Sequence, residues 1–142
     1  RRDIKSVNLL AQVLAKQAAH DAGAHEALMV DAEGYVTECG STSFFIVKGD
    51  LVLTRPLNND ILPGVTRRAV VALCNTHGLR LVENRFTLDD AKAADEAFIS
   101  GASTYILPVV KIDDQQISAG IPGELSRRLR DIYIGYARAS LI

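Results

Sequence analysis

The sequence is poor in several features that would mark it for particular classes of protein. It has no tryptophan, one methionine and two cysteines, and its formal net charge is −1. Cys39 and Cys74 lie far apart with no Cys/His cluster around them, which predicts reduced thiols and no disulfide framework or metal site. The small net charge gives no electrostatic reason to expect nucleic acid or an anionic membrane as a partner.

Long apolar runs are also absent, so neither a membrane span nor a signal peptide is predicted. Together with the reduced thiols, this favours a cytoplasmic protein. The 142 residues, 48% of them apolar and 23% charged, suit one globular domain. Because the chain begins at Arg1, in a segment that looks like the end of a strand, we expect an upstream region that these residues do not include.

Hydrophobic periodicity predicts a mixed α/β domain whose first half is mainly antiparallel. Helices are expected at 6–22, 66–77, 87–93 and from Gly123 or Glu124 to the end, and strands at 26–30, 35–37, 44–47, 51–54, 79–82, 97–99 and 105–112, the last interrupted by Pro108.

Lys5 is the first candidate for a chemical role. It lies between an extended-looking tetrapeptide, 1–4, and a predicted helix, so its amine would be held on a rigid frame, as a carbonyl-trapping lysine requires. A solvated surface lysine is the commoner case. Features far downstream, above all Glu38 and the turn 62–66, favour the chemical role. Together they predict a site for pyridoxal 5'-phosphate.

That cofactor needs an acid beside its ring nitrogen, a phosphate cradle and apolar packing against the ring. Glu38 is the candidate acid, although a solvated turn glutamate is the ordinary alternative. Two segments offer backbone N–H groups for phosphate, Gly64-Val65-Thr66 at the start of a helix and Gly101-Ala102-Ser103-Thr104 after a buried strand. Either segment is equally well explained as a plain turn. Leu62 could press on one face of the ring, or simply belong to the core.

The run from Glu38 to Arg67 resembles the signature of the class IV aminotransferases, which are fold-type IV pyridoxal phosphate enzymes. It contains an acid, a small-residue turn, two aromatic residues, a strand ending in threonine, and Leu62-Pro63-Gly64-Val65-Thr66-Arg67. Ser43 stands where the family usually has asparagine. The segments 1–10, 98–103 and 107–110 resemble those of the D-amino-acid aminotransferases within the class, although some relatives have threonine where this chain has Ala102.

The resemblance implies the fold and the activity. Residues 1–142 would be the large C-terminal cofactor-binding domain, with largely antiparallel strands forming a pseudo-barrel and flanking helices, and a small N-terminal domain would precede it. The protein would be a homodimer that moves an amino group between an amino acid, such as D-alanine, and a 2-oxo acid.

The resemblance also implies the roles of single residues. Lys5 would bind the cofactor covalently and then carry a proton between substrate and cofactor, with burial and the nearby cofactor keeping its amine neutral. Glu38 would hold the ring nitrogen and Leu62 would pack on the ring. Gly64, Val65, Thr66 and the turn of Gly101, Ala102 and Ser103 would hold the phosphate.

Three alternatives stay open at this point. An aminodeoxychorismate lyase uses the same lysine and acid for elimination. A branched-chain aminotransferase would usually have a tyrosine soon after the lysine, where this chain has Leu9-Leu10-Ala11. The chain could also be an inactive fragment or an interaction domain, since the groups that bind the substrate carboxylate cannot be assigned in it.

Overall fold

The computed structural model describes residues 1–7 and 9–140 of the chain. The elements, in order, are α1 (Leu10–Asp21), β1 (Leu28–Val30), β2 (Val36–Cys39), β3 (Ser43–Lys48), β4 (Leu51–Thr54), α2 (Val65–Thr76), β5 (Arg80–Glu83), α3 (Leu88–Lys92), β6 (Glu96–Gly101), β7 (Tyr105–Val109), β8 (Lys111–Ile112), β9 (Gln115–Gln116) and α4 (Glu124–Ala139).

The largest sheet has five strands in the order β5-β4-β3-β6-β7. Its pairs are antiparallel except for β4 and β5, which run parallel because α2 carries the chain back between them. Two hairpins, β1-β2 and β8-β9, form separate small sheets. The predicted mixed α/β architecture, with mainly antiparallel strands and flanking helices, is therefore confirmed.

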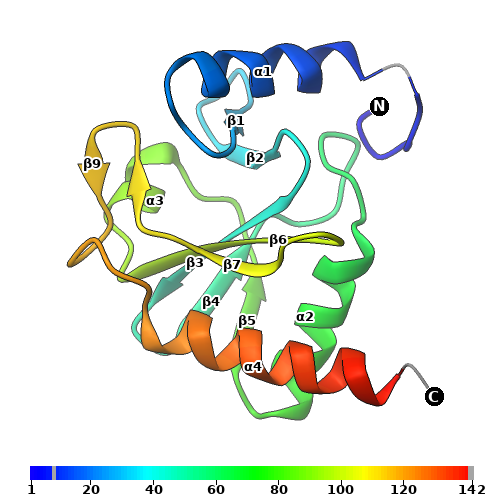
Figure 1. Cartoon of the computed structure of the whole chain (residues 1–142), viewed down its shortest axis with the longest axis vertical. Helices are drawn as coiled ribbons and strands as arrows, with labels where there is room; N and C mark the ends of the chain where they lie inside the picture. Colours follow the sequence, from blue (N-terminus) through cyan, green and yellow to red (C-terminus); the bar gives the residue numbers. More distant parts are fainter. Residues whose placement is uncertain (8, 141–142) are drawn as a thin grey trace.

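Strand β3 lies at the centre of the sheet and is buried on both faces. Phe44 and Ile46 contribute to one core, with Phe86 and the β8-β9 region, while Phe45 and Val47 contribute to the other. The second core lies under α2 and α4, which cover one side of the sheet in Figure 1. Burial on both faces explains why β3 is a continuous apolar run in the sequence and does not alternate.

Helix α1 has a different environment from the other long helices. In Figure 1 it lies with the β1-β2 hairpin beyond one end of the main sheet. None of its residues is buried, and the apolar side chains of Leu10, Val13 and Leu14 are all more than half exposed. The apolar residues whose spacing predicted this helix are therefore not buried against any other part of the described chain.

Two predictions for the N-terminal region are wrong. Residues 1–4 are not extended, because the Ile4 N–H bonds back to the Arg1 carbonyl and the Arg1 side chain pairs with Asp3 at 2.9 Å. The helix begins at Leu10 and not at Ser6, and residue 8 of the predicted first turn lies outside the described part. Local side-chain pairing and the lack of a neighbouring strand explain the turn.

Other boundaries also differ from the predictions. Strand β2 continues through Glu38 to Cys39, because Cys39 pairs with Leu28 of β1 and its N–H bonds to the Thr42 carbonyl. Pro108 does not interrupt β7, since this strand lies at the edge of the sheet, where a missing N–H is tolerated. The β8-β9 hairpin was not predicted, because two-residue strands leave almost no periodicity.

Over residues 1–7 and 9–140, no helix combines the length and the apolar character that a membrane crossing requires.

Candidate active site

A cavity of about 460 Å³ lies where four separated segments meet. This volume is typical of a site for a small molecule. Its walls come from the N-terminal segment with the start of α1, the end of β2 with the turn to β3, the loop that leads into α2, and the end of β6. The lining residues include Lys5, Glu38, Leu62, Gly64, Val65, Thr66, Gly101 and Ala102, all of them predicted for the site.

The N-terminal segment brings Lys5 to this cavity. The segment is anchored by a bond from the Arg2 N–H to the Asn59 carbonyl at 2.7 Å. Lys5 lines the cavity, yet its side chain is exposed among the described residues, so the burial implied for it is not provided by this chain alone. The reason is that residues 1–7 cross the mouth of the cavity and no described element covers them from outside.

Among the described residues that line the cavity, Glu38 is the one buried carboxylate. It projects from β2 with 7% of its surface exposed, and its two oxygens accept from Arg2 Nη2 at 2.8 Å and from the Leu62 N–H at 2.9 Å. Burial raises the pKa of this carboxyl above its ordinary value, while the Leu62 N–H and the Arg2 charge oppose the rise. Its fixed position contradicts the alternative of a solvated turn glutamate.

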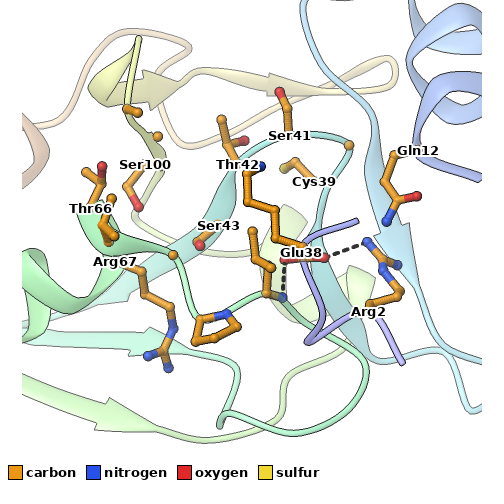
Figure 2. Close-up of a pocket in the computed structure, with 18 of the residues that line it drawn as sticks. Arg2, Gln12, Glu38, Cys39, Ser41, Thr42, Ser43, Thr66, Arg67 and Ser100 are labelled. Atoms are coloured by element: carbon orange, nitrogen blue, oxygen red, sulfur yellow. Dashed lines mark hydrogen bonds and ion pairs between the residues drawn. The ribbon is translucent and has the colours of Figure 1, made fainter. Parts of the chain in front are cut away.

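The opposite wall is the first turn of α2. Gly64 is its N-cap residue and supplies no side-chain cap, so the turn presents backbone N–H groups to the cavity. A Cβ at Gly64 would lie 3.4 Å from Ser43 Oγ, which shows how close β3 comes to this turn. Figure 2 shows Glu38 and Arg2 on one side, Thr66 and Ser100 on the other, and Ser43 between them.

The second predicted phosphate turn is brought to the same wall. Ser43 and Ser100 are directly paired across β3 and β6, so their side chains lie on the same face of the sheet. Ser100 Oγ and Thr104 Oγ1 are buried and have no hydrogen-bond partner among the described residues. Gly101 is closely packed, since a Cβ there would lie 2.9 Å from Thr42 Cγ2. Ser103, by contrast, is exposed and does not line the cavity.

Arg2 and Ser100 line the cavity but were not predicted from the sequence. No sequence pattern marks Arg2, because its contact with Glu38 depends on the turn at residues 1–4. Ser100 precedes the predicted turn and ends an apolar strand, so a search for inward polar groups at strand ends could have found it. Arg67 also lines the cavity, but its guanidinium bonds to the Arg55 carbonyl and pairs with Glu83 at 3.1 Å.

The two cysteines are free and buried. Burial raises the pKa of Cys39 to about 12 and that of Cys74 to about 11, so both are neutral thiols at physiological pH. Within the described ranges, no group of three or more His, Cys, Asp or Glu side chains could hold a metal ion. The polar groups available for chemistry are therefore the Lys5 amine, the Glu38 carboxylate, the Arg2 guanidinium, the hydroxyls and the backbone N–H groups.

Comparison with known proteins gives consistent similarities. Residues 1–112 match the family described as amino-transferase class IV. The chain is 40% identical to a D-alanine aminotransferase of Bacillus licheniformis over 130 residues, which are 92% of this chain and 46% of that protein. The chain thus spans about half the length of the curated relatives it matches.

Solved structures show the same fold. A branched-chain amino acid aminotransferase from Thermobaculum terrenum in its PLP form superposes with a TM-score of 0.91 and 31% identity, over 97% of this chain and 46% of that one. A branched-chain amino acid aminotransferase from Escherichia coli gives a TM-score of 0.86 and 30% identity, over 90% of this chain and 43% of that one.

Proposed function

We propose that this chain, which belongs to the class IV aminotransferases, binds pyridoxal 5'-phosphate and takes part in moving an amino group between an amino acid and a 2-oxo acid. The observation that carries the proposal is the cavity itself. It has an amine at its mouth and a fixed carboxylate at one side. At the other side it has an uncapped helix turn and a hydroxyl that has no partner among the described residues.

The residues fit the cofactor at both of its polar ends. A buried carboxylate such as Glu38 suits a protonated ring nitrogen, because a buried charge requires a partner. The N–H groups of Val65 and Thr66, with the unpartnered Ser100 Oγ nearby, suit a phosphate. Gly101 and Ala102 add a turn without large side chains. Ser103, which is exposed outside the cavity, is dropped from this assignment.

When bound, pyridoxal phosphate supplies a ring that withdraws electrons from the α-carbon of an amino acid. Glu38 would hold the proton of the ring nitrogen in place, which maintains that withdrawal. Leu62, whose side chain lines the cavity beside Glu38, would orient the ring by packing. Lys5 Nζ would bind the cofactor. When released, the amine would take a proton from the α-carbon of the substrate and deliver it to the cofactor.

We also propose that residues 1–142 correspond to the C-terminal cofactor-binding domain of a longer protein with a small N-terminal domain. The similarity to about half of each relative supports this assignment. The exposed lysine at the mouth also supports it, because a covering domain would exclude water from the amine. The two free thiols suit the predicted cytoplasmic location, which stays a prediction.

A homodimer is proposed from the surface of α1. Leu10, Val13 and Leu14 are 64%, 59% and 59% exposed, and a helix that exposes such side chains together marks an interaction site. We expect a second copy to cover this face. Multi-angle light scattering should give the mass of a dimer, and a monomer at all concentrations would contradict the proposal.

Two amino donors are supported by different observations. The similarity to D-alanine aminotransferases and the absence of tyrosine in Leu9-Leu10-Ala11 favour a D-amino acid. The relatedness to branched-chain enzymes, at 30% and 31% identity, makes a branched-chain amino acid the second candidate. Initial rates with each donor and the same 2-oxo acid would decide between them.

The cofactor proposal is tested by titrating the purified chain with pyridoxal phosphate, reducing it with borohydride and mapping the labelled peptide. We expect a visible absorption band that reduction removes, with the label on Lys5. Lys5→Ala should abolish labelling, while Lys111→Ala, an exposed lysine that does not line the cavity, should leave it unchanged. Labelling spread over surface lysines, or none at all, would contradict the proposal.

A further inference from the structure

We propose that Arg2 is a positioning residue that fixes the Glu38 carboxylate in the cavity and keeps it in its charged form. The functional role of this contact rests on the proposed cofactor site, whereas the contact is seen in the structure independently of that proposal. Figure 2 shows the Arg2 guanidinium reaching Glu38 from the side opposite Thr66 and Ser100.

Three parts of the chain converge on Glu38. The carboxyl projects from β2, the loop before α2 supplies the Leu62 N–H at 2.9 Å, and the N-terminal segment supplies Arg2 Nη2 at 2.8 Å. The Arg2 N–H in turn bonds to the Asn59 carbonyl of that same loop at 2.7 Å. Arg2 therefore ties the carboxylate and the loop together: its backbone N–H holds the loop and its side chain holds Glu38. A side-chain substitution at Arg2 would remove the contact to Glu38 and leave the backbone contact to Asn59 in place.

The charges favour a role for Arg2 beyond packing. The Glu38 side chain is 9% exposed and that of Arg2 27% exposed, so solvent screens this pair only in part. Burial alone would drive Glu38 toward its neutral acid, whose O–H would donate and no longer accept. Arg2 stabilises the acceptor form. A proton shared with a ring nitrogen would then reside on the nitrogen.

No other ionisable group lining the cavity provides this charge to Glu38 in the described structure. Asp3 pairs with Arg1, Arg67 pairs with Glu83, and the Cys39 thiol is neutral. Lys5 also lines the cavity, but no hydrogen bond joins its amine to Glu38. Arg2 Nε is buried without a partner within residues 1–7 and 9–140.

The first test needs no cofactor. The carboxyl carbon of Glu38 is followed by NMR against pH in the apo chain and in Arg2→Met, Arg2→Gln, Arg2→Lys and Arg1→Met. Both neutral Arg2 variants should shift the titration to higher pH, and Arg2→Lys should restore it in part. Arg1→Met is the matched control, because Arg1 pairs only with Asp3 in the described part, and it should leave the titration in place. An unchanged titration in Arg2→Gln would overturn the proposal.

The second test follows thermal unfolding of the apo chain against pH. A carboxyl whose folded pKa is raised makes unfolding easier as pH rises through that pKa. Without the Arg2 charge, the loss of stability with rising pH should continue to a higher pH, because the folded pKa of Glu38 is then higher still. Arg2→Gln should therefore unfold at a lower temperature than the wild type at pH 8, and the difference should shrink where Glu38 is protonated in both. A difference independent of pH would mean a purely structural residue.

The two proposals fail in different ways. If pyridoxal phosphate does not label Lys5 but the Glu38 titration still depends on Arg2, the proposed function is wrong and the Arg2 contact stands. If Lys5 is labelled but Glu38 titrates identically in all variants, the positioning role is wrong. In the protein with bound pyridoxal phosphate, the visible absorption band reports the protonation of the ring nitrogen. Arg2→Gln should lower the pH at which this nitrogen loses its proton.

Discussion

Gly64→Ala should separate the stability of the fold from the affinity for the phosphate. The backbone of Gly64 (φ −60°, ψ 139°) is allowed for alanine, and the added methyl would lie 3.4 Å from Ser43 Oγ, which is ordinary contact. Alanine at an N-cap costs roughly 0.5–1 kcal/mol relative to glycine. The more restricted unfolded chain returns about 0.4–1 kcal/mol. The fold should therefore change in stability by less than about 0.5 kcal/mol.

The cavity should be affected much more. The methyl would stand between Ser43 and the first turn of α2, where phosphate oxygens would approach the backbone N–H groups. Loss of one hydrogen bond to a charged group costs about 1.5–3 kcal/mol. The dissociation constant for pyridoxal phosphate should therefore rise roughly ten- to a hundred-fold.

Absorption titration and thermal unfolding measure these two effects on the same samples. The control is Gly135→Ala in α4, where a Cβ meets nothing within 4 Å. It should raise stability by about 0.5–1 kcal/mol without changing cofactor affinity. Unchanged affinity in Gly64→Ala would refute the placement of the phosphate at α2, and a large fall in the unfolding temperature would refute the conformational reasoning.

Three further predictions concern other groups. Glu38→Gln should still capture the cofactor but slow removal of the α-proton by about ten- to a hundred-fold, since it loses a charged hydrogen bond; single-turnover kinetics measure this rate. Bonds from Lys48 and Thr87 lower the pKa of Asp90 to about 2, so the stability it adds should be lost as pH falls from about 4 toward 2. Asp90→Asn should therefore make the free energy of unfolding less dependent on pH in that window. The change should be no more than about 1 kcal/mol, because the Lys48–Asp90 pair is partly solvated. Cys39 and Cys74 should resist a thiol reagent at pH 8 until the chain is denatured, and rapid labelling of the native protein would contradict their buried, neutral state.

Much of the fold was predictable from the sequence because its main signals are local. Strands β3 and β4 and helix α2 carry strong apolar patterns, and glycines or a threonine mark their ends. The turn at residues 1–4 was not predictable, because it depends on a side-chain pair between Arg1 and Asp3. The continuation of β2 through Glu38 depends on pairing with β1, which a polar residue at that position conceals.

The candidate site divides in the same way. Lys5, Glu38, Gly64 and Gly101 were predicted from their local sequence context and from a family resemblance, and the structure brings them to one cavity. The contribution of Ser100 depends on the register that pairs it with Ser43, and that of Arg2 on an anchor to Asn59. Contacts across the sheet or between distant loops leave no periodic signal in the sequence. The chemical roles of these residues stay predictions until the cofactor is titrated.

The assembly of the cavity from distant segments has a consequence for folding kinetics. Its walls bring together the N-terminal segment, the β2–β3 turn, the start of α2 and the end of β6, so the loops that must close span up to about a hundred residues. Pairings of such high contact order form late, after local helices and hairpins. A chain that is only partly folded should therefore have no affinity for the ligand. Ligand capture during refolding would report the last step, and excess ligand would shift the equilibrium toward the native state by mass action.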